Sequence, residues 1–187
     1  MKKIAKFHKV SREQFVSDWK DALGRDGQGN TLNEKVNQDA VLAETYYEKI
    51  KLPRRATANS AGYDFFLPFA LALAPGEEIK IPTGIRVEME PEWVLQLYPR
   101  SGLGFKYRLQ MNNTVGIIDS DYFYSDNEGH ILMKLINDSR EGKRLELNEG
   151  MAFAQGIFME YGITVDDDAD AVRNGVLGVQ MWGNRNG

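Results

Sequence analysis

The sequence contains no cysteine, which excludes disulfide bonds and thiolate zinc sites. Histidine is nearly absent too, since His8 and His130 are the only two, and they are too few for a typical zinc hydrolase. No apolar run reaches the ~18 to 20 residues that a membrane span requires, and Met1 to Val10 is basic and alternating rather than apolar. We therefore expect a cytoplasmic protein without a membrane partner.

The sequence also lacks an excess of positive charge. Lysine and arginine total 23 against 27 aspartates and glutamates, which gives a net charge of −4. Binding along a nucleic-acid backbone depends on clustered cations that displace counterions, so no nucleic-acid partner is expected. A polyphosphate ligand would have to be neutralised by a metal ion and a few well-placed cations.

The chain is long enough for one core of ordinary size. Its 187 residues, 42% of them hydrophobic, are too few for two full domains. We therefore expect a single domain over residues 1–187 with one embellishment.

The embellishment is a predicted helical insertion at about residues 11–50. Ser11 and Gln14 have the spacing of a capping box, and apolar residues at helical spacing follow them up to Gly24. Thr31 and Glu34 open a second box whose apolar stripe includes Leu32, Val36, Ala40, Ala43 and Tyr47. Two interpretations are open: a helical hairpin that covers apolar surface, or a surface that binds a protein partner.

From Ala61 onward the apolar pattern changes to period two. Ile79, Ile81, Ile85, Val87 and Met89 alternate with polar residues, and Trp93–Tyr98, Ile131–Ile136 and Met151–Phe158 are further predicted strands. The β body is expected to begin with Lys2–Val10, before the insertion, and to resume near Thr57. Many short strands of this kind are typical of an all-β sandwich or jelly roll. The run of aspartates at Asp166–Asp170 is interpreted as a solvated loop, because a metal loop spaces its ligands around a glycine turn.

Two segments carry residues suited to phosphate chemistry. Pro99–Gly102 offers a guanidinium, a hydroxyl and a flexible backbone, which together can hold phosphate oxygens; a plain surface turn is the alternative. Asn113–Tyr122 contains two carboxylates and a tyrosine directly after an apolar pair. Such carboxylates are candidate general bases, although aspartate at a strand end is also a common turn former.

Four motifs together resemble those of the trimeric dUTP pyrophosphatase family in order and approximate spacing. They are Ala61-Gly62-Tyr63-Asp64, Pro99-Arg100-Ser101-Gly102-Leu103-Gly104, Gly116-Ile117-Ile118-Asp119-Ser120-Asp121-Tyr122, and Ala154-Gln155 within Glu149–Phe158. Each motif alone is weak, whereas four in sequence order are specific. The resemblance implies a jelly-roll subunit, a homotrimer with active sites between subunits, and hydrolysis of dUTP to dUMP and pyrophosphate with Mg²⁺ held mainly by the triphosphate.

The resemblance also implies roles in the chemistry. Asp119 is similar to the family's general base, which deprotonates a water for attack on the α-phosphorus. Arg100, Ser101, the Gly102 amide and Gln155 resemble the family's phosphate ligands. Donors of this kind stabilise the charge that grows on the leaving pyrophosphate.

Recognition of the base is assigned by the same resemblance. Asn113 and the backbone around Gly116, Ile117 and Ile118 match the family's uracil-reading hairpin, and Met133 aligns with a position that reaches the base through its backbone. A backbone groove can pair with uracil while mispairing with the amino group of cytosine.

Two further positions have alternative interpretations. Tyr122 resembles the residue whose ring lies under the deoxyribose and leaves no room for a ribose 2′-hydroxyl; the alternative is a core aromatic. Asp64 belongs to the family's metal and phosphate environment, where it either supports the Mg²⁺ site without ligating the ion or is purely structural.

The sequence departs from the family at its C-terminus. The fifth motif is a glycine-rich arm that begins with arginine and includes a phenylalanine, and no complete copy is present. Arg173–Gly178 has the opening without the aromatic, whereas Arg185-Asn186-Gly187 reads as the start of the motif. We favour the second interpretation, in which Arg185 contacts phosphate and a mobile arm follows it.

Two other functions remain as alternatives. A dCTP deaminase-like enzyme would share the fold but attack the base, and Asp119 together with Tyr122 argues against it. A regulatory protein would bind dUTP without hydrolysing it and use the helical insertion to bind a partner.

Overall fold

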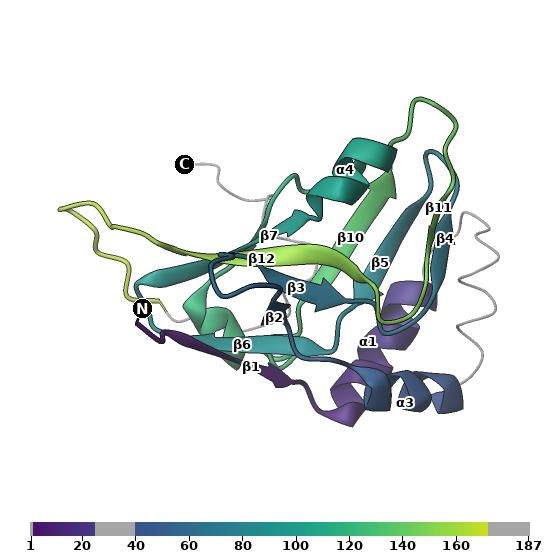
Figure 1. The fold of residues 1–187 in the computed structure, drawn as a ribbon. Coiled ribbons are helices and arrows are strands. Elements are labelled where there is room, and N and C mark those ends of the chain that lie inside the picture. The colour runs from purple at the N-terminus through teal and green to yellow at the C-terminus, as the bar shows by residue number, and fades with distance from the viewer. Residues whose placement is uncertain (1, 25–39, 172–187) are drawn as a thin grey trace.

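The computed structural model describes residues 2–24 and 40–171, and within them it has the predicted β architecture. In chain order the elements are β1 (Ala5–Lys9), α1 (Arg12–Gly24), α3 (Ala40–Lys49), β2 (Arg54–Arg55), β3 (Tyr63–Phe66), β4 (Leu71–Leu73), β5 (Glu78–Pro82), β6 (Ile85–Met89), β7 (Trp93–Pro99), α4 (Ser101–Tyr107), β8 (Leu109–Met111), β9 (Gly116–Ile118), the 3₁₀ helix η1 (Ser120–Tyr124), β10 (Leu132–Asn137), β11 (Leu145–Leu147) and β12 (Ala152–Glu160) (Figure 1).

The described strands pair antiparallel in short sheets. The largest has the order β2-β3-β12-β7-β9, and the others are β5-β10-β8, β1-β6 and β11-β4. Non-consecutive neighbours such as β12 and β7 mean that the chain crosses between sheets, as it does in a jelly roll. The strands predicted from period-two alternation are thus confirmed, and the alternating run from Ile79 to Met89 forms two of them, β5 and β6, which pair with β10 and β1.

Alternation along the strands builds the core. In β5 and β10 the residues Ile79, Ile81, Met133 and Leu135 are buried, while Lys134 between the last two is exposed. Because successive side chains of a strand point to opposite faces, this pattern gives each sheet one apolar face. These faces enclose a single hydrophobic cluster among the described residues.

The helical insertion is part of that cluster. Phe15 and Trp19 of α1 are 0% and 1% exposed, and the Trp19 ring contacts Phe69 of the β body edge-to-face at 4.9 Å. From α3, Tyr46 stacks on Trp19 and Tyr47 lies against Phe15. The predicted apolar face of the first helix is confirmed, and α3 confirms the end of the second; Leu32 and Val36 lie outside the described residues.

The start of α1 differs in detail from a reciprocal capping box. The Ser11 hydroxyl accepts the Gln14 N–H at 3.1 Å, as predicted, but the Gln14 side chain donates onward to Asp18. The N–H of Ser11 donates instead to Glu128 at 2.7 Å. A tertiary contact has therefore replaced half of the local motif.

The segment after Pro99 is a short helix where the sequence suggested a turn. Gly102 and Gly104 have low intrinsic helix propensity, but Leu103 and Tyr107 are four residues apart and both pack against the core. The helix ends at Arg108, whose positive φ of 50° is a left-handed cap. Packing has thus overridden local propensity.

The chain after β12 is exposed up to residue 171, which confirms a solvated loop for Asp166–Asp170. None of the helices in the described ranges combines the length and apolarity needed to cross a membrane.

Candidate functional site

Three neighbouring strands bring polar side chains of distant motifs into one row. In the register of the largest sheet, Gln155 of β12 lies opposite Asp64 of β3 on one side and Tyr98 of β7 on the other. Directly opposed residues point to the same face of a sheet. Because Phe65 and Ala154, one position along, are fully buried, the row lies on the outer face.

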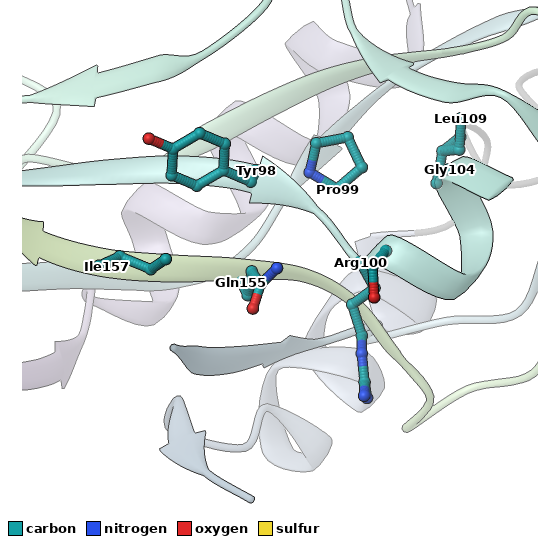
Figure 2. A pocket seen from close by; sticks show the side chains of 8 residues that line it. Tyr98, Pro99, Arg100, Gly104, Leu109, Gln155 and Ile157 are labelled. Carbon is teal, nitrogen blue, oxygen red and sulfur yellow. The ribbon is translucent and has the colours of Figure 1, made fainter. Parts of the chain in front are cut away.

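A pocket of about 390 Å³ lies at the end of this row. Its lining combines β7, the start of α4, β8 and β12, and consists of Tyr98, Pro99, Arg100, Ser101, Gly104, Leu109, Gln155 and Ile157. Figure 2 shows Gln155 beside Tyr98, with Arg100 at the point where β7 ends. The structure thus brings together Arg100, Ser101 and Gln155, and exposed Gly102 follows in the first turn of α4. We call this region the pocket end of β7.

Asp64 contacts the arginine of the pocket. The Arg100 guanidinium donates to the Asp64 carboxylate at 3.4 Å, where Asp64 is 14% exposed and Arg100 is 44% exposed. An ion pair with one solvent-exposed partner contributes little to stability. Its effect is to hold the guanidinium at the pocket edge while leaving it free to bond an anion.

Gly62 makes room for Gln155, a role that the sequence analysis did not assign. A Cβ atom at position 62 would lie 2.6 Å from Gln155 Oε1. Such an approach is closer than van der Waals contact allows, so any larger residue would displace the amide. The signal was the glycine of the Ala-Gly-Tyr-Asp motif, whose partner only the strand register reveals.

The second group of predicted residues lies along β9 and the turn before it. Gly116 and Ile117 lie opposite Leu97 and Gln96 of β7, and Ile117 is 42% exposed on the outer face. Asn113 lies in the exposed turn between β8 and β9, where its carbonyl accepts the Val115 N–H. These residues form a hairpin that leans against β7 from the side opposite β12.

Met133 borders the same hairpin. Its side chain is fully buried, so only its backbone is available to a ligand. The pairing of β8 with β10 stops near it, where the Asn112 N–H donates to the Lys134 carbonyl at 3.0 Å. Met133 therefore lies one position beyond the last bond between β10 and the turn that contains Asn113.

Asp119 and Tyr122 follow β9 in η1. Asp119 is half-buried at the N-cap position, but its side chain makes no capping bond, so a capping role does not account for it. Tyr122 is 6% exposed; its hydroxyl donates to the His130 carbonyl and accepts from Asn127, both at 2.9 Å. The ring is thus fixed by hydrogen bonds within the chain. We call Asn113–Tyr122 the hairpin end of β7.

The two ends are separated in one chain. Ile118 pairs with Leu95, four residues before Pro99, which corresponds to about 13 Å of strand. Asp119 and Ser101 lie beyond these two points in opposite directions along β7. Consistent with this, η1 packs beside β6, and Figure 1 shows β6 on the opposite side of the molecule from α4. A single chain does not bring Asp119 to the pocket.

The structure offers few protein ligands for a metal ion. Within residues 2–24 and 40–171, no three histidine, aspartate or glutamate side chains converge as a metal cage. Asp64 supplies one carboxylate at the pocket, which suits an ion that takes most of its oxygen ligands from a bound polyphosphate. Arg185, the remaining predicted phosphate ligand, lies outside the described residues.

Comparison with known sequences gives a consistent result. The family model for dUTPase matches residues 48–181, so the match begins after β1 and nearly all of the helical insertion. The deoxyuridine 5'-triphosphate nucleotidohydrolase of Lactococcus lactis subsp. lactis is 38% identical over 135 residues, which are 72% of this chain and 89% of that protein. The Psychromonas ingrahamii protein of the same name is 41% identical over 108 residues, which are 56% of this chain and 68% of the relative.

Solved structures agree. The crystal structure of dUTPase from Streptococcus mutans is similar with a TM-score of 0.55 and 35% identity, over 63% of this chain and 90% of that one. A dUTPase from phage phi11 of S. aureus, described with a coordinated structural Mg(II) ion, has a TM-score of 0.54 and 22% identity over 66% of this chain and 92% of its own. At that identity the second likeness is one of fold alone.

Proposed function

The chain belongs to the dUTPase family and is a dUTP nucleotidohydrolase, and we propose that it splits dUTP at a site whose two halves come from different subunits. The observation that carries the proposal is the register of β7 with its neighbours. Pocket and hairpin residues border one strand but lie at opposite ends of it, so the complete set meets only when copies of the chain associate. A closed homotrimer provides such identical, shared interfaces.

The pocket end binds the triphosphate in this proposal. Arg100 and Gln155 donate hydrogen bonds to phosphate oxygens, and the Ser101 hydroxyl contacts the chain near the scissile bridge. The exposed Gly102 amide adds a donor without a side chain in the way. Because these donors are fixed before the reaction, they stabilise the charge that grows on the leaving pyrophosphate.

The hairpin end supplies the attacking water. Asp119 from a second subunit orients a water against the α-phosphorus and accepts its proton as the new P–O bond forms and the bond to pyrophosphate breaks. A carboxylate is a weak base in water, so positioning and exclusion of solvent supply much of its effect. Its half-buried position at the start of η1 supports this role.

The base and sugar bind against the same hairpin. The backbone of Gly116–Ile118, together with Asn113 and Met133, offers hydrogen-bonding groups that suit the edge of uracil. A cytosine amino group would leave buried groups unpaired, which costs more than a lost apolar contact. The Tyr122 ring, fixed through its hydroxyl, closes the space beside C2′ of the sugar.

Mg²⁺ is the proposed cofactor. Bound to the triphosphate, it would neutralise charge and polarise phosphoryl oxygens. Asp64, next to Gln155 and bonded to Arg100, would contact the ion's water shell and hold the guanidinium in place. The Arg185 side chain is a further proposed phosphate ligand.

Turnover assays separate this proposal from its rivals. With Mg²⁺ present, dUTP should yield dUMP and pyrophosphate, and Asp119→Asn should abolish turnover while preserving nucleotide binding. Ammonia released from dCTP would instead identify a deaminase. Tight dUTP binding without hydrolysis by the wild-type chain would identify a regulator.

A further inference from the structure

The helical insertion is joined to the hairpin end of the site by polar contacts. Directly after Tyr122 the chain makes a long return to β10, and we call residues 123–130 the return loop. Two side chains of this loop, Glu128 and His130, bond to the insertion. Both contacts span more than 100 residues of sequence, so they link the insertion specifically to the segment that follows the proposed base.

His130 is the centre of this link. Its ring is fully buried, with Nδ1 2.5 Å from the Asp18 carboxylate of α1. On the other side Nε2 accepts the backbone N–H of Gly84 at 2.7 Å, so that nitrogen carries no hydrogen. The ring hydrogen is therefore on Nδ1 and is donated to Asp18, which also accepts from Gln14 at 2.9 Å.

The same residue fixes Tyr122. The backbone carbonyl of His130 accepts the Tyr122 hydroxyl, and Asn127 donates to that hydroxyl from within the return loop. The side chain of His130 faces α1 while its carbonyl faces the tyrosine. The bonds of the imidazole to α1 and to Gly84 therefore help to hold in place the residue whose carbonyl accepts the Tyr122 hydroxyl.

We propose that Asp18 is a positioning residue for nucleotide recognition, acting from the insertion through His130 to fix the Tyr122 ring. This inference rests on the proposed function, since it assigns Tyr122 to the sugar pocket. It gives the insertion a task in sugar selection besides covering the core. Ser11 adds a second link, because its N–H donates to Glu128 at 2.7 Å from the position directly before the same helix.

The bonding pattern supplies matched variants. Both bonds to Asp18 use Oδ2, so the single carbonyl oxygen of Asp18→Asn retains them, whereas Asp18→Ala removes them. Lys20→Ala on the exposed face of α1 is the control. Glu128→Asn is a second test of the loop: asparagine tolerates the positive φ of 57° at this position but is too short to reach Ser11.

The experiment measures kcat and KM for dUTP and UTP alongside thermal unfolding. Asp18→Ala should raise KM for dUTP about fivefold, which corresponds to the loss of the buried hydrogen bond between His130 and Asp18. The preference for dUTP over UTP should fall by a similar factor. The kcat for dUTP should change less than about twofold, since no phosphate contact is altered. Asp18→Asn and Lys20→Ala should match the wild type, and Glu128→Asn should move KM and preference in the direction of Asp18→Ala.

A purely structural role would lower the unfolding temperature of Asp18→Ala while leaving KM and sugar preference unchanged, and that result would overturn the proposal. If Asp18→Ala does not fold, unchanged sugar preference in Glu128→Asn would overturn it equally. Failure of the proposed function is a separate result, because it would show as wild-type protein that does not hydrolyse dUTP, or as full turnover by Asp119→Asn.

Nitrogen NMR of the two histidines tests the link directly. The sequence has only two histidines, His8 and His130. The imidazole signals that disappear in His8→Asn therefore belong to His8, and the remaining signals belong to His130. His130 should show hydrogen on Nδ1 in the wild type and in Asp18→Asn, and a changed or averaged pattern in Asp18→Ala. An identical His130 pattern in all three would contradict the role of Asp18.

Discussion

The pocket end and the hairpin end of the site border the same strand, β7, but are held by different kinds of interaction. At the pocket end, strand register alone aligns Asp64, Gln155 and Tyr98 on an outer face, and the Asp64–Arg100 pair is partly exposed. At the hairpin end, buried hydrogen bonds run from Tyr122 through His130 to the insertion. The first end is thus partly open to solvent and the second is fixed by buried bonds, which suits the triphosphate and sugar roles proposed for them.

The largest expected effect concerns the proposed base at the hairpin end. Asp119→Asn should lower kcat by about 10²- to 10⁴-fold, because an amide cannot accept the proton of the water. Binding of a non-hydrolysable dUTP analogue should change less than about threefold, since charge at the phosphates is untouched. Steady-state kinetics with isothermal titration calorimetry measure both, and retained turnover would refute the assigned base.

At the pocket end, substitutions of Gln155 and Gly62 should affect the binding of dUTP through the same side chain, that of Gln155. Gln155→Ala should raise KM for dUTP about tenfold through loss of a charge-assisted bond to phosphate. Gly62→Ala should have a similar effect, because the new Cβ would lie only 2.6 Å from Gln155 Oε1 and would displace the amide. The double variant should be no worse than Gln155→Ala alone. Additive effects would mean that Gly62 acts elsewhere.

The buried bonds of the hairpin end predict a change in stability. Tyr122→Phe keeps the ring but removes the hydroxyl shared by His130 and Asn127, so the free energy of unfolding should fall by about 1 to 2 kcal/mol. The kcat should stay within about twofold. Tyr124→Phe is the control, since Tyr124 is 71% exposed. Equal denaturation midpoints for the two variants would show that these bonds do not stabilise the fold.

The smallest expected effect is a dependence of stability on pH. Burial opposes ionisation of Glu128, but hydrogen bonds from Ser11 and the charge of Arg86 outweigh it and lower its pKa below 4.5. A lowered pKa means that the folded state favours the ionised form. The resulting stability is present above pH 4.5 and is lost as the pH falls through the folded-state pKa.

Glu128→Gln removes the ionisable group and so tests whether the ionised carboxylate of Glu128 stabilises the fold. The difference in unfolding free energy between wild type and variant should shrink as the pH is lowered from 6 toward 3, over the window set by the pKa. Urea titrations at several pH values measure the difference. A constant difference across this range would contradict the assigned pKa shift.

The sequence was most informative where pattern and structure are local. Period-two alternation predicted the main strands, and the spacing of Phe15 and Trp19 predicted the buried face of α1. The four motifs located Arg100, Ser101 and Gln155, which share a pocket.

What the sequence did not reveal depends on contacts between distant segments. Ser11 donates to Glu128 rather than completing a local box, and Gly62 is matched to Gln155, 93 positions further on, only by strand register. The bond between Asp18 and His130 leaves no spacing signal for the same reason. The segment Ser101–Tyr107 is helical despite the low helix propensity of its glycines, because Leu103 and Tyr107 pack against the core.

Subunit complementation tests the shared site most directly. Asp119→Asn is mixed with an Arg100→Ala/Ser101→Ala chain, each inactive alone, under conditions that exchange subunits. If the two ends come from different chains, random mixing should restore about one quarter of wild-type activity, because that fraction of sites combines two intact halves. No recovery in oligomers that demonstrably contain both chains would contradict a site built between subunits.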